Sequence, residues 1–96
     1  MTKVVHCEKE PYDIYIGRPS KWGNPFVSGV DGTRSIVIQK YRTWLLNSPD
    51  SAPLRNELHE LKGKILGCWC KPKDCHGDVL AELADNNVMS VLDEIH

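Results

Sequence analysis

The sequence predicts a small single-domain α/β fold, with a sheet of three to four strands, a right-handed βαβ-type crossover and helices packed on the sheet. Short runs rich in β-branched and aromatic residues at 3–8, 13–17 and 64–70 have strand composition. Apolar residues at helical spacing fill the interval between the second and third runs and also follow the third. Two strands joined by such a helical interval pair in parallel, and the crossover between them is nearly always right-handed.

Length and composition narrow the class of protein. With 96 residues the chain fits one domain, expected over 1–96, and 41% hydrophobic with 26% charged residues is typical of a folded globule. The formal net charge of -1 gives no general attraction to nucleic acid or to an anionic membrane. No apolar run approaches the roughly 20 residues of a membrane span, and the first ten residues lack the apolar core of a secretory signal. We expect a cytoplasmic protein without membrane contact, whose cysteines are thiols or metal ligands rather than disulfides.

The first two strands are expected at Lys3–Glu8 and Asp13–Gly17. The few residues between them suit an antiparallel hairpin better than a parallel crossover. Arg18–Pro25 then reads as a loop rich in turn-forming residues.

Two helices are expected next. Thr33–Asn47 has an apolar stripe and can be capped by Asp31 or Thr33. A second helix opens at Ser51 with Pro53 in its first turn and ends at Gly63. The two predicted stripes consist of Val37, Tyr41, Trp44 and Leu45 in the first helix, and Leu54, Leu58 and Leu61 in the second.

The third strand, Lys64–Cys70, is apolar on both faces, so we expect it to be covered on both sides. A helix over Cys75–Ala84 follows, and Val88–His96 is predicted to form a short final helix. In parallel sheets, ligands bind outside the carboxyl ends of the strands. The loop 18–24 after the second strand and the corner 70–78 after the third should therefore face one another and form a site.

The corner could hold a metal. On a strand, Cys68 and Cys70 project from the same face, and the next loop can return Cys75 or His76 toward them. These are four candidate zinc ligands, because zinc prefers four nitrogen or sulfur donors. The spacing lacks paired CxxC knuckles, however, and free cysteines are often simply buried core residues.

The same corner could instead carry catalytic groups. The free N–H groups at a helix N-terminus favour a thiolate at Cys75 or a bound anion, with His76 or Asp78 as acid–base candidates. Gly77 would let a ligand approach the backbone closely. Adjacent residues on a helix seldom face each other, and the alternative for Asp78 is that it only caps the helix and complements its dipole.

The loop 18–24 offers groups suited to a nucleotide. Arg18 and Lys21 could bind phosphate, Trp22 could stack on a ring and Asn24 could form hydrogen bonds. The loop has no GxGxxG or P-loop pattern. The alternative is a structural turn in which Trp22 fills part of the core.

Two phrases, YIGRPSKWGNPF at 15–26 and GKILGCWCKPKDCHGDVLAEL at 63–83, carry a family resemblance. They resemble a small phage and bacterial family catalogued as a domain of unknown function, DUF4326, and the resemblance extends over about 13–83. It implies a phage or prokaryotic origin and a cytosolic setting, which is the host cytoplasm for a phage protein. It assigns no catalytic residues.

Two hypotheses about function follow. In the first, the chain binds a nucleotide-like phosphorylated small molecule between the loop 18–24 and the corner 70–78. Whether it is also an enzyme of nucleotide or nucleic-acid metabolism is left open by the sequence. In the second, it is a non-enzymatic module stabilised by zinc that binds nucleic acid or a host protein. The sequence leaves the oligomeric state open.

Overall fold

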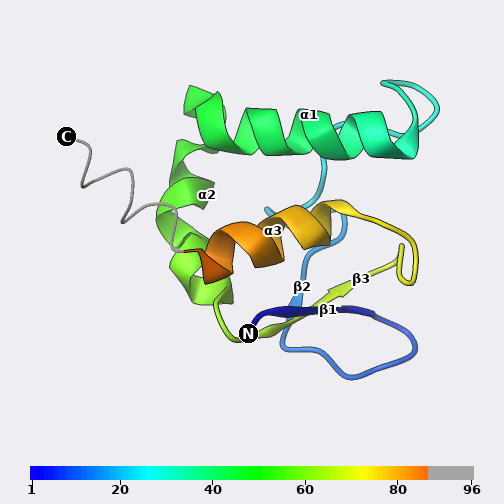
Figure 1. Cartoon of the computed structure of the whole chain (residues 1–96), viewed down its shortest axis with the longest axis vertical. Coiled ribbons are helices and arrows are strands. Elements are labelled where there is room, and N and C mark those ends of the chain that lie inside the picture. The colour runs from blue at the N-terminus through cyan, green and yellow to red at the C-terminus, as the bar shows by residue number, and fades with distance from the viewer. Residues whose placement is uncertain (87–96) are drawn as a thin grey trace.

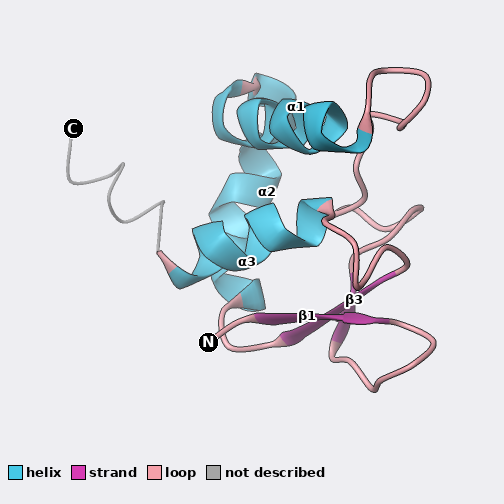
Figure 2. Ribbon diagram, turned by 45° about the vertical axis from the view of Figure 1, so that its right-hand side comes forward, coloured by secondary structure: helices cyan, strands magenta, loops and turns pink. Residues whose placement is uncertain are grey.

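The computed structural model describes residues 1–86 and has a parallel three-stranded sheet with its helices gathered on one side (Figures 1 and 2). The strand order is β1–β3–β2, so the last strand in the sequence is the central one. The strands are β1 (Lys3–His6), β2 (Ile14–Tyr15) and β3 (Ile65–Cys68). The predicted α/β class and the crossover between two parallel strands are confirmed.

The helical segments match the apolar stripes of the sequence. The first stripe is buried at Val37, Tyr41 and Leu45, while Trp44 is half-buried. The second predicted helix is divided into a short α-helix and 3₁₀ turns. The segments are α1 (Arg34–Asn47), η1 (Pro49–Ser51), α2 (Ala52–Glu57), η2 (Leu58–Leu61) and α3 (His76–Asp85). The helix predicted at 88–96 lies outside the described residues, and no described helix is long and apolar enough to cross a membrane.

The predicted hairpin between the first two strands is wrong. Val4 of β1 and Ile14 of β2 both align with Leu66 of β3, and both pairings are parallel. The segment 7–13 therefore returns the chain to the amino edge of the sheet instead of making a tight turn. A hairpin would have left one side of β3 without a partner strand, whereas the central position lets its backbone groups pair on both sides.

The two faces of β3 are covered in different ways. On one face the start of α3 packs closely on the sheet, where a Cβ at Gly77 would lie 2.7 Å from Ile16 and 2.9 Å from Val4. On the other face the ring of Tyr12 lies over Gly67, where an added Cβ would be 2.6 Å from the ring. Both faces of β3 are therefore covered, as expected, but one of them is covered by the side chain of a loop residue, Tyr12.

A hydrogen bond joins α1 to the loop after β2. The hydroxyl of Tyr41, fully buried in the core, donates to the carbonyl oxygen of Trp22 at 2.8 Å. The Trp22 side chain is itself only 3% exposed and belongs to the hydrophobic core. This loop is therefore held from the inside by the helix that follows it.

The N-terminus is tied to the end of α3. The backbone N–H of Thr2 donates to both oxygens of the Asp85 carboxylate at 3.0 and 3.1 Å, and its hydroxyl donates to one of them at 2.6 Å. These bonds stabilise the ionised carboxylate and lower the pKa of Asp85. Because its folded pKa is depressed, Asp85 contributes stability above its unfolded pKa, and the contribution is lost as the pH falls through the folded value.

We predict that Asp85→Asn lowers the thermal unfolding midpoint at neutral pH, because the charge that attracts the Thr2 donors is removed. Below about pH 4 the Asp85 carboxyl of the unfolded wild type takes up a proton more readily than the folded one. The wild type then loses the stability that the variant lacks, so the difference between the two midpoints should shrink. Calorimetry across the acid range measures this. Glu8→Gln is the matched control, because the exposed Glu8 carboxylate has no hydrogen bond or ion pair with residues 1–86. An equal deficit at pH 7 and about pH 3 would contradict the assignment.

Candidate functional site

A cavity of about 270 Å³ lies at the carboxyl edge of the sheet, beyond β2 and β3. Its walls come from the loop after β2, the first turns of α1 and the corner between β3 and α3. Arg18, Arg34, Trp69 and His76 all contribute to it. The two unusual loops of the sequence therefore meet at the edge where parallel strands place their ligands.

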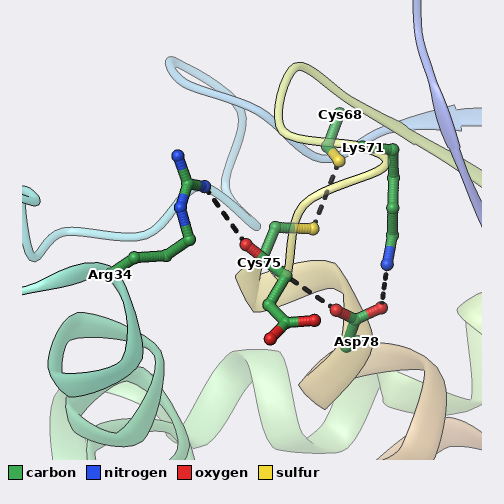
Figure 3. A network of polar contacts seen from close by, with 6 residues as sticks. Arg34, Cys68, Lys71, Cys75 and Asp78 are labelled. Carbon is green, nitrogen blue, oxygen red and sulfur yellow. Dashed lines mark hydrogen bonds and ion pairs between the residues drawn. The ribbon is translucent and has the colours of Figure 1, made fainter.

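Two hydrogen bonds link the residue after β3 to the loop after β2 through the Tyr15 hydroxyl of β2. The indole N–H of Trp69 donates to the Tyr15 hydroxyl at 2.7 Å, and that hydroxyl donates to the carbonyl oxygen of Arg18 at 3.0 Å. A third contact crosses the cavity from α1, where the guanidinium of Arg34 donates to the carbonyl oxygen of Asp74 at 3.2 Å (Figure 3). Side chains from three distant parts of the chain thus fix the cavity walls.

The four residues singled out in the loop 18–24 divide into two pairs. Arg18 and Asn24 line the cavity. Asn24 is also structural, since its amide donates to Val37 O at 3.2 Å and its carbonyl oxygen accepts from Phe26 N at 2.9 Å. Lys21 and Trp22 lie elsewhere.

Lys21 points toward α2 and η2, away from the cavity. Its ammonium is 2.8 Å from the carboxylate of Glu57 and 3.8 Å from that of Glu60. Trp22 is buried in the core, as the alternative interpretation of this loop proposed. The exposed indole at the cavity is Trp69, which is 54% exposed, and the second cation is Arg34.

Neither Arg34 nor Trp69 was identified as a site residue from the sequence. Arg34 is the first residue of α1, so its position in the sequence suggests an ordinary solvated helix terminus. Trp69 follows β3 in an apolar run and resembles a core residue. The sequence did contain one signal for its exposure. Successive side chains on a strand point to opposite faces, so Trp69 should point away from the face of the buried Cys68.

At the corner, Asp78 caps α3 rather than lining the cavity. Its carboxylate accepts from the backbone N–H of Cys75, the N-cap residue, at 3.1 Å, and it also pairs with the Lys71 ammonium (Figure 3). This is the carboxylate half of a capping box. Gly77 faces the sheet, where its lack of a side chain allows close packing against Val4 and Ile16.

His76 lines the cavity in its neutral form. Its Nε2 lies 2.7 Å from the carbonyl oxygen of Ile16. A carbonyl can only accept, so Nε2 carries the proton and the basic lone pair is on Nδ1. Burial lowers the pKa of His76, and the edge contact with the Tyr41 ring adds to its apolar surroundings.

Two of the three corner cysteines form a thiol pair. The sulfurs of Cys68 and Cys75 are 3.2 Å apart, and both residues are buried (Figure 3). The Cys75 S–H stabilises a thiolate on Cys68 and lowers the pKa of Cys68 to about 6, while the same bond and burial raise the pKa of Cys75. The two sulfurs are therefore within S–H···S hydrogen-bond distance of each other.

The four candidate zinc ligands are not gathered into one set. Within residues 1–86, no group of three or more histidine, cysteine or acidic side chains is arranged to hold a metal ion. Cys68 and Cys75 are close together, and Cys70 also lines the cavity. His76, by contrast, directs its Nε2 to a backbone carbonyl.

The fold and this cavity define a small α/β domain whose pocket lies at the carboxyl edge of a parallel sheet. The chain belongs to the family described as a domain of unknown function, DUF4326, whose model matches residues 2–86. The resemblance found in the sequence is thus confirmed.

Two relatives come from viruses. The chain is 34% identical over 86 residues to the "Uncharacterized 12.4 kDa protein in nrdA-td intergenic region" of Enterobacteria phage T4, covering 88% of this chain and 79% of that protein. It is 37% identical over 89 residues to "Uncharacterized protein R718" of Acanthamoeba polyphaga mimivirus, covering 74% of this chain and 65% of that protein. No solved structure matches.

We predict that Asp78→Ala lowers the free energy of unfolding by about 0.5–2 kcal/mol, the usual cost of losing a helix cap. Urea unfolding measures the loss. Asp74→Ala is the matched control, because the Asp74 side chain is exposed and only its backbone oxygen takes part in a hydrogen bond within residues 1–86. Unchanged stability in Asp78→Ala would show that the cap contributes nothing.

Proposed function

We propose that this chain binds a nucleotide-like phosphorylated small molecule in the cavity at the carboxyl edge of its sheet. The observation that carries the proposal is the convergence of two guanidinium groups and an exposed indole on one pocket. A nucleotide presents the complementary pair of features, an anionic phosphate and a flat aromatic base.

The phosphate would bind to Arg18 and Arg34. The side chain of Arg18 has no hydrogen bond or ion pair within residues 1–86, and that of Arg34 donates only to a backbone oxygen. Both guanidiniums therefore keep donors for a ligand, and arginine binds phosphate through two parallel hydrogen bonds. Asp74 lines the same cavity and would disfavour an anion on its side, so the phosphate is expected nearer to Arg18.

The base would stack on Trp69. This indole is anchored at its N–H by Tyr15, and it packs against the His6 ring in a T-shaped arrangement with 5.8 Å between ring centroids. An aromatic side chain fixed in this way contributes stacking at a low entropic cost, and base stacking is worth about 1–3 kcal/mol per base.

The size of the pocket favours a mononucleotide over a polynucleotide. Its volume of about 270 Å³ lies just below the range of roughly 300–1,000 Å³ that is usual for small-molecule sites. Duplex binding usually needs several phosphate contacts, and this cavity offers two arginines.

An enzymatic role in nucleotide or nucleic-acid metabolism is part of the same proposal. Among the three catalytic candidates, Cys75 and His76 are in the cavity wall. His76 is neutral and holds its basic nitrogen at Nδ1, so it could accept a proton from a ligand or an attacking water. Asp78 would support them only indirectly, by capping α3.

The first test is the response of Tm to nucleoside monophosphates, with the corresponding nucleosides as controls lacking phosphate. A ligand at one hundred times its Kd stabilises by about 2.7 kcal/mol, on the order of 10 °C for a domain of this size. We predict that Arg18→Ala weakens binding by about tenfold to a hundredfold, the cost of losing a charged hydrogen bond.

Lys21→Ala is the matched control for Arg18→Ala. It removes one positive charge from the same loop, but its ammonium faces Glu57 rather than the cavity. Binding in this variant should remain within about twofold of the wild type, since an exposed charge outside the site contributes little. The proposal fails if no nucleotide shifts the wild-type Tm, or if the two variants lose affinity equally.

The second test concerns the stacking surface. We predict that Trp69→Ala weakens nucleotide binding by about 1–3 kcal/mol, because the base loses its aromatic partner. Isothermal titration calorimetry measures this. Val30→Ala truncates another exposed apolar side chain, 80% exposed and outside the cavity, and should leave Kd unchanged. Unchanged affinity in Trp69→Ala would place the base elsewhere.

A further inference from the structure

The thiol pair under the cavity joins two elements that only the fold brings together. Cys68 is the last residue of β3 and Cys75 is the N-cap residue of α3. The intervening loop, 69–74, turns back so that the two sulfurs face each other at 3.2 Å (Figure 3). A disulfide has sulfurs about 2.05 Å apart, so the two atoms need to approach by only about 1.2 Å to bond.

The surroundings of the pair favour a nucleophilic sulfur on Cys68. A thiolate on Cys68 would accept from the Cys75 S–H at 3.2 Å, and the backbone N–H groups of Cys70 and Lys71 would stabilise it further. The ammonium of Lys71, held in place by Asp78, adds positive charge nearby. A thiolate rather than a thiol is the species that attacks oxidants.

The thiol pair lies in the wall of the cavity. Cys68 and Cys75 are each at most 2% exposed, and both residues line the cavity of about 270 Å³. A molecule of liquid water occupies about 30 Å³, so a reagent only slightly larger fits easily in this space. Bulky thiol reagents would be excluded from the same position.

We propose that Cys68 and Cys75 form a redox-active dithiol that hydrogen peroxide converts to an intrachain disulfide. The Cys68 thiolate attacks one peroxide oxygen, the O–O bond breaks, and the departing hydroxide takes up a proton to leave as water. Cys68 is then a sulfenic acid. The Cys75 sulfur attacks the Cys68 sulfur, the S–O bond breaks, and a second water leaves with the Cys75 proton. Two thiols are oxidised by two electrons in all, and one peroxide is reduced to two waters.

The other two cysteines provide internal comparisons. Cys7 is half-buried and its pKa is raised, chiefly by burial, so it remains protonated at neutral pH. Cys70 is close in sequence and also lines the cavity, but the sulfur paired with Cys75 belongs to Cys68. The proposal therefore distinguishes Cys68 from both neighbours and does not depend on nucleotide binding.

The test treats the reduced chain of 96 residues with hydrogen peroxide and counts free thiols after denaturation. We expect the chain to lose two of its four thiols and to regain them with dithiothreitol. Peptide mapping should find Cys75 joined to the 65–73 tryptic peptide, which holds both Cys68 and Cys70. Cys70→Ser should keep this link, and Cys68→Ser should lose it.

Trapping of the sulfenic acid gives an independent readout. In Cys75→Ser the resolving thiol is gone, so dimedone should label Cys68, whereas Cys68→Ser should give no label at Cys75. Circular dichroism melting checks that each variant folds, and Cys7→Ser controls for the loss of any thiol. The proposal is overturned if Cys68 oxidises no faster than Cys7 in the wild type, or if the disulfide joins other cysteines or separate chains.

Discussion

The structure depends on the parallel pairing of β3 with a strand on each side. Cys7 N donates to Cys68 O on one side at 2.9 Å, and Ile16 N donates to Gly67 O on the other at 2.9 Å. Because all three strands run in the same direction, their carboxyl ends meet at one edge. The loops after β2 and β3 are thereby brought together, and the cavity exists only because of this arrangement.

The corner between β3 and α3 then decides what the cavity contains. Capping by Asp78 fixes the first turn of α3, which places Cys75 against Cys68 and His76 against the sheet. Close contact at Gly77 lets that turn approach the strands. The same few contacts therefore stabilise the helix, bury His76 and hold the two sulfurs together, so stability and candidate chemistry share one set of residues.

Individual side chains explain why part of the site was not predictable. Trp22 and Trp69 both follow strands, yet one is 3% and the other 54% exposed. The difference arises from the core, where α1 covers the first loop and fixes it through Tyr41. Lys21 likewise pairs with Glu57 from α2, a partner that lies 36 residues away in sequence. Local residue type cannot reveal such long-range partners.

The sequence by itself determined the α/β class, the helices up to residue 85 and the approximate place of the cavity, because apolar periodicity and turn residues act over short distances. Tertiary structure decided that β3 is central, which side chains enter the cavity and which sulfur meets Cys75. These features depend on how segments about fifty residues apart pack against each other, and the free energy of that packing is not contained in any local pattern.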